Sequence, residues 1–134
     1  TIIRPENALA DLLESHRTAD ACLSLGLFPT ERPWKFGMVD VDADSNVLST
    51  IDKPKDSDLK YMWGTCVWSP QFTQLINTFL EEHESGGKET VLGDVFDEAL
   101  RRQLSVKGFA SENGSYIDIG TSDELNIALQ QFHS

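Results

Sequence analysis

The stretch from Phe36 to Gly64 constrains the fold most strongly, because it predicts two short strands joined by a tight turn. Apolar and β-branched residues dominate 36–41 and 47–51, and the five residues between these runs, 42–46, are polar or small. Two strand-forming runs separated by a short polar segment are typical of a β-hairpin. The chain therefore contains at least one antiparallel pair of strands.

The turn of this hairpin also resembles the start of a calcium loop, since Asp42, Asp44 and Asn46 fall at every second position. An EF-hand loop would then need glycine where Val47 stands and glutamate where Lys53 stands. Both positions fail, so we interpret the segment as a hairpin turn.

The second strand of the hairpin ends in a charged tip, Asp52-Lys53, directly before Pro54. Proline cannot donate to a sheet and favours an extended residue before it, so we expect the strand to stop here with Lys53 extended. Ligands of open α/β sheets bind outside the carboxyl ends of strands. A single ammonium at this place predicts an anion site, with a surface lysine at a strand end as the alternative.

The remaining chain alternates between helical and strand patterns. Four helices are predicted. The first starts at Pro5 and buries Leu9, Leu12, Leu13 and His16, and the second starts at Pro70 after a Ser69 cap and ends at Gly86-Gly87. The third starts near Leu92, and the fourth follows a Thr121/Glu124 capping box and buries Leu125, Ala128, Leu129 and Phe132. The predicted strands outside the hairpin are 21–28, 61–68, 104–109 and 115–120. Helices mixed with a sheet that holds a hairpin indicate an α/β fold with a mixed sheet.

Composition limits the class of protein. The chain has 134 residues, of which 40% are hydrophobic, so we expect one domain over residues 1–134. Its formal net charge of -11 argues against a nucleic-acid partner, because phosphate backbones require clustered Lys and Arg. No apolar run is long enough to predict a membrane span, and no signal peptide is recognisable.

Two further features concern the cell compartment and the length of the chain. Cys22 and Cys66 lie in apolar, strand-like runs and predict reduced cysteines in the core of a cytoplasmic protein. The sequence begins at Thr1 without a methionine, so we expect it to be an interior piece of a longer chain.

Asp118 is the second candidate for chemistry, because it stands between Ile117 and Ile119 directly before a glycine turn. A carboxylate buried there would require a partner such as a metal, a base or backbone donors. The alternative is a structural aspartate that hydrogen-bonds the turn at 120–121. Gly64 lies inside a predicted strand and marks a place where a ligand or another backbone comes close. The sequence has no cluster of His and Cys, no Gly-rich phosphate loop and no recognisable nucleophile and base pair.

The order of the short motifs resembles the second half of the sugar-1-phosphate nucleotidylyltransferases. The resemblance covers nearly the whole chain and is carried by Phe36-Gly37, Asp52-Lys53-Pro54, Tyr61-Met62-Trp63-Gly64, Ser69-Pro70, Lys88-Glu89 to Gly93-Asp94, and Tyr116-Ile117-Asp118-Ile119-Gly120-Thr121. It implies the three-layer α/β/α nucleotide-diphospho-sugar transferase fold, with a mixed sheet and with the N-terminal nucleotide-binding half missing.

In that family a sugar-1-phosphate oxygen attacks the α-phosphorus of an NTP and pyrophosphate leaves, a reaction that needs positioning and charge neutralisation. The resemblance implies that Lys53 contacts the phosphate of the sugar phosphate and that Asp118 binds Mg²⁺. It also implies that Gly37 approaches the sugar through its backbone, that Gly64 lines the same pocket, and that Glu89 lies near the sugar.

The chain departs from the family pattern at two positions and in length. Asp52 stands where relatives usually carry glutamate, and Trp63 stands where they often carry a small or polar residue, so the sugar stays undefined. The resemblance places the second metal-binding aspartate of the family immediately upstream of Thr1. We therefore expect these residues alone not to turn over NTP and sugar-1-phosphate.

Two other functions are compared with that of a nucleotidylyltransferase, namely a binding module and a glycosyltransferase. A non-catalytic module of the same fold could bind a sugar phosphate or a nucleotide sugar for regulation, and this is the alternative to the enzyme. A glycosyltransferase lacks support, because no Asp-x-Asp donor motif stands in a suitable place and Asp42-Ala43-Asp44 is better explained by the hairpin turn. Assembly as a homo-oligomer is compatible with either function.

Overall fold

A computed structural model describes residues 1–83, 92–120 and 122–132. Five strands form one sheet in the order β4-β3-β5-β2-β6, with bounds Leu23–Pro29 (β2), Gly37–Val41 (β3), Val47–Asp52 (β4), Tyr61–Trp68 (β5) and Val106–Ala110 (β6). Strand β6 runs parallel to β2, whereas the pairs β2/β5, β3/β5 and β3/β4 are antiparallel. The sheet is therefore mixed, as the hairpin predicts.

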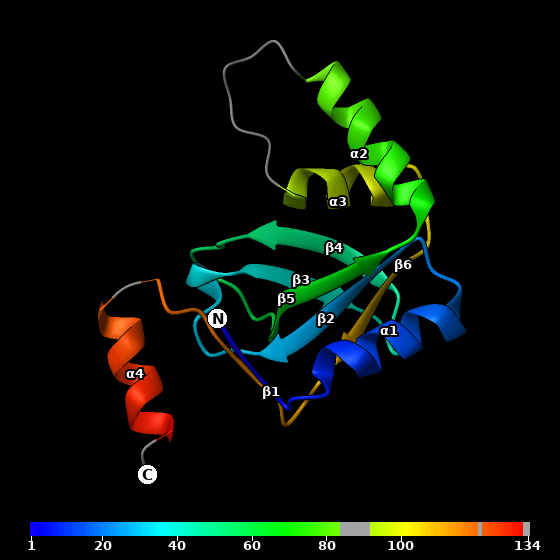
Figure 1. Cartoon of the computed structure of the whole chain (residues 1–134). Coiled ribbons are helices and arrows are strands. Elements are labelled where there is room, and N and C mark those ends of the chain that lie inside the picture. Colours follow the sequence, from blue (N-terminus) through cyan, green and yellow to red (C-terminus); the bar gives the residue numbers. More distant parts are fainter. Residues whose placement is uncertain (84–91, 121, 133–134) are drawn as a thin grey trace.

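Helices cover both faces of this sheet. Figure 1 shows α2 and α3 on one face and α1 on the other, with α4 standing to the side; the bounds are Ala8–Ala19 (α1), Pro70–Glu82 (α2), Leu92–Arg101 (α3) and Ser122–Phe132 (α4). A short 3-10 helix, η1 (Pro33–Lys35), precedes β3. The three layers confirm the predicted α/β/α architecture.

Strand β2 lies at the centre of the core, because side chains on both of its faces are buried. Leu23, Leu25 and Leu27 are fully buried in the cluster that also holds Phe72 of α2 and Phe96 of α3. Phe28 points to the other face, into a cluster with Ala8, Met38 and Met62. A nearly continuous apolar run thus marks a strand buried on both faces, as predicted for 21–28.

The predicted hairpin is confirmed as β3 and β4. Asp42 closes its turn, since the Asp42 carboxylate accepts hydrogen bonds from the backbone N–H groups of Asp44 (2.9 Å) and Asn46 (2.8 Å). The hydrogen bonds from Asn46 and Asp44 and the nearby Lys107 lower the pKa of the Asp42 carboxyl. The turn is therefore held by its own aspartate, without any need for calcium.

The expectation that Pro54 holds Lys53 extended is wrong. Lys53 has φ 46°, in the left-handed region, while its N–H donates to the carbonyl of Phe36 at 2.9 Å. This hydrogen bond adds one more link to the β3/β4 ladder, which ends with the pair Gly37 and Asp52. The chain then turns sharply, and a proline that cannot pair follows the turn.

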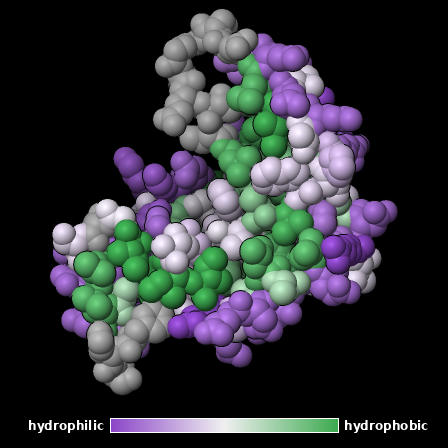
Figure 2. All heavy atoms as spheres, viewed as in Figure 1, coloured by the Kyte–Doolittle hydropathy of each residue, from purple (hydrophilic) through white to green (hydrophobic). Residues whose placement is uncertain are grey.

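Two predicted helices bury fewer side chains than expected. Helix α1 begins at Ala8 instead of Pro5, because a turn in which the Ala8 N–H bonds the Pro5 carbonyl precedes it. Its inward residues are Ala8, Leu12 and His16, whereas Leu9 and Leu13 are exposed. In α4, Ala128 is buried, but the prediction of buried Leu125 and Leu129 is wrong, since both are exposed. Figure 2 shows the resulting apolar surface over α4.

A short strand at the start of the chain was not predicted. Strand β1 (Ile2–Arg4) pairs antiparallel with β7 (Ser115–Ile117), and Ile2 lies opposite Ile117. Strand β7 ends one residue before Asp118, so it is shorter than the predicted strand 115–120. The start of the chain is thereby fixed beside the candidate residue Asp118.

Helix α2 begins as predicted, with Ser69 as its N-cap residue and Pro70 in its first turn. The Ser69 hydroxyl does not cap the helix and instead donates to the carbonyl of Ala21 at 2.8 Å. His16 lies between Ser24 (Nδ1 to Oγ, 2.7 Å) and Ser69 (Nε2 to Oγ, 3.1 Å). His16 is therefore a buried core-edge histidine that joins α1, β2 and α2, in agreement with the structural role expected for it.

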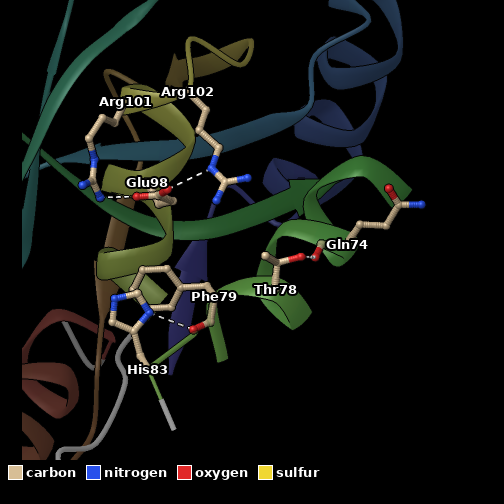
Figure 3. Close-up of polar contacts among 7 residues, drawn as sticks. All are labelled: Gln74, Thr78, Phe79, His83, Glu98, Arg101 and Arg102. Carbon is tan, nitrogen blue, oxygen red and sulfur yellow. Dashed lines mark hydrogen bonds and ion pairs between the residues drawn. The ribbon is translucent and has the colours of Figure 1, made fainter. Parts of the chain in front are cut away.

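Polar side chains stabilise the C-terminal ends of α2 and α3 (Figure 3). Glu98 pairs with both Arg101 and Arg102, and the hydrogen bond from Arg102 lowers the pKa of the Glu98 carboxyl. His83 stacks on Phe79 with ring centroids 4.0 Å apart, and its Nδ1 donates to the Phe79 carbonyl at 2.8 Å. The predicted helix stop at Gly86-Gly87 lies outside the described residues.

Two further predictions concern cysteines and membranes. Cys22 is buried, Cys66 is partly buried, and both are free, as predicted. Burial raises the pKa of both thiols. Among the residues that the structure describes, no helix combines the length and the apolar character needed to cross a bilayer.

Candidate functional site

The hairpin and α3 enclose a cavity of about 310 Å³, here called the Lys53 cavity. Its lining combines residues of the hairpin, one residue of β5 and the first residues of α3, namely Gly37, Thr50, Ile51, Asp52, Lys53, Trp63, Leu92, Gly93, Asp94 and Asp97. One ammonium, three carboxylates and an indole ring thus meet at a strand end. The structure brings together three predicted site residues here, Gly37, Asp52 and Lys53.

Gly37 forms the floor of the Lys53 cavity together with Trp63. A Cβ atom on Gly37 would lie 2.4 Å from the indole Nε1 of Trp63, so no larger residue fits while the ring keeps its place. The ring of Trp63 is fixed from behind by Phe96, with ring centroids 5.0 Å apart in an edge-on arrangement. The ring of Trp63 therefore lines the cavity in a fixed orientation.

The mouth of the Lys53 cavity is connected to α3 by a hydrogen bond. The hydroxyl of Thr50 in β4 donates to the carboxylate of Asp97 at 2.6 Å. Sequence reasoning missed both residues, because Asp97 has the spacing of a solvent-facing helix residue and Thr50 that of an ordinary strand residue. Only the packing of α3 against β4 brings them to the cavity.

A second cavity, of about 330 Å³, is here called the Asp118 cavity. It is lined by residues from the segment before β3, from β7 and from α4, including Thr30, Arg32, Lys35, Phe36, Tyr116, Asp118 and Gln131. Sequence reasoning did not single out Arg32 or Lys35 as site residues. Their approach to Asp118 depends on η1 and on the β1/β7 pair, which short-range sequence patterns do not show.

Asp118 is exposed at the end of β7, and its Oδ1 accepts a hydrogen bond from the hydroxyl of Thr1 at 3.1 Å. The expected cost of burying a carboxylate in an apolar strand therefore does not arise. Nor does Asp118 close the glycine turn in the described residues, since Glu124 accepts the Gly120 N–H at 3.0 Å. Thr121, the other half of the predicted capping box, lies outside the described residues.

Lys53 and Asp118 line different cavities. Phe36 lines the Asp118 cavity, and the next residue, Gly37, lines the Lys53 cavity. Gly64 belongs to the lining of neither, and a Cβ there would lie 2.5 Å from the ring of Tyr116. Side-chain packing therefore accounts for a glycine at this position. Glu89 lies outside the described residues.

The residues at Asp118 fit a hard cation in their chemistry. A carboxylate and the Thr1 hydroxyl offer oxygen donors, and proteins often hold Mg²⁺ with one or two carboxylates while water and substrate phosphates complete the shell. Over residues 1–83, 92–120 and 122–132, no three His, Cys, Asp or Glu side chains gather as a metal site on their own. Asp118 could thus supply one ligand of a shared site.

Comparison with known proteins gives a consistent result. A family model described as nucleotidyl transferase matches residues 1–134, the full length of the chain. The low-salt glycan biosynthesis nucleotidyltransferase Agl11 of Haloferax volcanii is 28% identical over 126 residues, which are 93% of this chain and 34% of Agl11.

A solved structure agrees in fold. A crystal structure assigned as a glucose-1-phosphate thymidylyltransferase from Bacillus anthracis, in complex with a sucrose, superposes with a TM-score of 0.75 and 16% sequence identity over 97% of this chain and 50% of that chain. The chain thus spans about a third of one relative and half of the other.

Proposed function

Because this chain belongs to the nucleotidyl transferase family, we propose that it forms the sugar-phosphate-binding part of a longer enzyme that transfers a nucleotidyl group from an NTP to a sugar-1-phosphate. The products of this reaction are a nucleotide sugar and pyrophosphate. The names of the relatives, a glycan biosynthesis nucleotidyltransferase and a glucose-1-phosphate thymidylyltransferase, support a sugar-phosphate acceptor. The nucleobase and the sugar are left open.

The observation that carries the proposal is the composition of the Lys53 cavity. Lys53 supplies the cation for the phosphate, and Gly37 and Trp63 line the same cavity, where we expect them to contact the sugar. Asp52, beside Lys53, can accept a hydrogen bond from a sugar hydroxyl. Transfer between phosphates needs little covalent chemistry from the protein, so holding the acceptor in place is a sufficient role for these residues.

Asp118 is proposed as a ligand of Mg²⁺, which when bound supplies positive charge to the reacting phosphates. Thr1 lies at Asp118 in the β1/β7 register, so a residue joined to Thr1 from upstream in a longer chain would lie next to this carboxylate. The free cysteines support a reducing, cytoplasmic location.

The proposal is tested by measuring pyrophosphate release from the full-length protein with a panel of NTPs and sugar-1-phosphates. We expect turnover with at least one pair, and Lys53→Ala should raise the KM for the sugar phosphate at least about tenfold, because it removes a charge-assisted contact. Lys55→Ala is the matched control, since Lys55 is equally exposed two residues away but does not line the cavity. Folded full-length protein that releases no pyrophosphate with any pair of the panel would refute the proposed enzymatic activity.

A binding or regulatory module is the second candidate, and one observation favours it. Lys53 and Asp118 line separate cavities, so the described residues do not hold a phosphate and a metal in one place. Sugar-phosphate binding that is independent of Mg²⁺, by full-length protein without turnover, would support the module. Loss of turnover in Asp118→Asn, with the sugar-phosphate affinity unchanged, would support the enzyme instead.

A further inference from the structure

The short helix η1 brings two cationic side chains to the Asp118 cavity. Arg32 stands directly before η1, and Lys35, three positions later, is its last residue. Side chains three positions apart in a 3-10 turn project in the same direction. Two hydrogen bonds hold this turn, since the N–H groups of Lys35 and Phe36 donate to the carbonyls of Arg32 (3.0 Å) and Pro33 (3.3 Å). Arg32 and Lys35 therefore line the cavity as a pair.

Neither of these cations is neutralised by a neighbour. Among the described residues, the side chains of Arg32 and Lys35 form no ion pair and no hydrogen bond. Asp118 lines the same cavity, and its carboxylate accepts a hydrogen bond from Thr1 without pairing with either cation. Opposite charges that line one cavity without pairing leave room for a ligand between them. Such a ligand would present negative groups to the cations and a positive group to the carboxylate.

The charge of the whole lining narrows the class of ligand. Two further carboxylates line the cavity, those of Glu31 and Glu124, and Glu124 accepts the N–H of Gly120. Three carboxylates against two cations disfavour a free anion. A divalent cation on Asp118 would make the lining positive overall, so the cavity suits an anion that arrives together with a metal ion.

We propose that Arg32 and Lys35 bind the β- and γ-phosphates of the NTP, and the pyrophosphate that these become, while Asp118 binds the Mg²⁺ that the phosphates carry. This inference rests on the proposed function, which supplies the NTP and assigns Mg²⁺ to Asp118. Guanidinium groups match phosphate oxygens with paired donors, and Mg²⁺ in proteins is commonly shared between a carboxylate and substrate phosphates. When the bond from the α-phosphorus to the bridging oxygen breaks, its electron pair leaves with pyrophosphate. Two cations that contact this group stabilise the added negative charge.

The two cavities then receive different phosphates. The Lys53 cavity has one lysine and no arginine in its lining, which suits the single phosphate of the acceptor. The Asp118 cavity has an arginine and a lysine, which suits the two phosphates of pyrophosphate. The number of cations in each cavity therefore agrees with a division between acceptor and donor.

An NMR titration of the full-length protein with inorganic pyrophosphate and Mg²⁺ tests this site. We expect saturable shifts at the backbone amides of Arg32 and Lys35 and at the Arg32 Nε–H. Arg32→Gln and Lys35→Gln should each raise the Kd for pyrophosphate at least about tenfold, because each removes a charge-assisted hydrogen bond. Arg32→Lys and Lys35→Arg should restore part of the affinity, since the charge remains.

Arg17→Gln and Lys55→Gln are the matched controls, because both residues are exposed cations that line neither cavity. Their Kd for pyrophosphate should equal that of the wild type. Equal weakening in all four glutamine variants would overturn the proposal, since any surface cation would then do the same. Shifts at Arg32 and Lys35 with a sugar-1-phosphate and none with pyrophosphate would overturn it too, because the acceptor phosphate would then be the ligand.

The metal dependence of pyrophosphate binding gives an independent readout. Removing Mg²⁺ with EDTA should raise the Kd measured at Arg32 and Lys35 at least about tenfold, and in Asp118→Asn this difference should largely disappear. A full effect of Mg²⁺ in Asp118→Asn would overturn the proposal. Neither experiment needs turnover. Specific pyrophosphate binding without turnover would refute the proposed function alone, whereas turnover with an unchanged Kd in Arg32→Gln and Lys35→Gln would overturn this site alone.

Discussion

Replacing Gly37 by alanine tests the geometry of the Lys53 cavity most sharply. The new methyl group would lie 2.4 Å from Nε1 and 2.9 Å from Cδ1 of Trp63, well below van der Waals contact. The indole cannot simply retreat, because Phe96 packs behind it at 5.0 Å between ring centroids. Either the ring or the β3 backbone must therefore move.

Forcing an extra methyl group into a packed site costs about 1–3 kcal/mol of unfolding free energy. With an m-value of about 2 kcal/mol/M, the urea midpoint of Gly37→Ala should fall by about 0.5–1.5 M. In a Trp63→Leu background the ring is gone, so the same substitution should cost less than about 0.5 kcal/mol. The double-mutant cycle then gives a coupling of about 0.5–3 kcal/mol, as expected for residues in contact.

Urea unfolding followed by far-UV circular dichroism measures all four proteins of this cycle. Gly93→Ala is the matched control, because Gly93 lines the same cavity but a Cβ there would meet no heavy atom within 4 Å. That control should be neutral or slightly stabilising, since alanine is the better helix former. An equal cost of Gly37→Ala in both backgrounds would refute the contact with Trp63.

Three further predictions follow from the described contacts. Burial lowers the pKa of His16 in the folded state, so on acidification the imidazole is protonated in the unfolded state at a higher pH than in the folded state. The free energy of unfolding should therefore fall as the pH drops below about 6.5. A urea midpoint that stays constant from pH 7.5 to 5.5 would contradict this. Asp42→Ala should lower the urea midpoint at pH 7, because the hairpin turn loses its acceptor, and the difference from wild type should shrink in acid, where the lowered pKa of Asp42 is passed. Thr50→Val should cost no more than about 1.5 kcal/mol in chemical denaturation, as it removes one hydrogen bond to Asp97 at an exposed site; a larger loss would mean that this bond holds α3 in place.

The local parts of the fold could be read from the sequence. The β3/β4 hairpin, its Asp42 turn and the Ser69-Pro70 start of α2 depend on residues within a few positions of one another, and all three are confirmed. The buried β2 was also predictable, because a strand covered on both faces needs an uninterrupted apolar run.

The parts that depend on distant contacts could not be predicted. Strand β1 has only three residues, and its partner β7 lies at the other end of the chain, so no local pattern identifies it. The helical spacing of Leu9 and Leu13 gave the same signal as that of Leu12, yet only Leu12 faces the core. Apolar periodicity indicates that a side chain is suited to burial and does not tell which surface covers it.

The candidate site likewise has one part that depends on residues close in sequence and another that depends on distant contacts. Gly37, Asp52 and Lys53 meet because one hairpin carries them, and this could be expected from the sequence. The relation of Asp118 to Lys53 depends on how β7 and η1 pack around Phe36, and the structure places the two residues in different cavities. Thr50 and Asp97 complete the Lys53 cavity through tertiary packing alone.

The central claim is that a sugar-1-phosphate binds in the Lys53 cavity. The most direct measurement is an NMR titration of the full-length protein with sugar-1-phosphates, followed at the backbone amides of Gly37 and Lys53 and at the indole N–H of Trp63. We expect saturable shifts at these three groups that disappear in Lys53→Ala and persist in Lys55→Ala. Saturable shifts confined to Arg32, Tyr116 and other residues of the Asp118 cavity, or no shifts with any sugar phosphate, would contradict it.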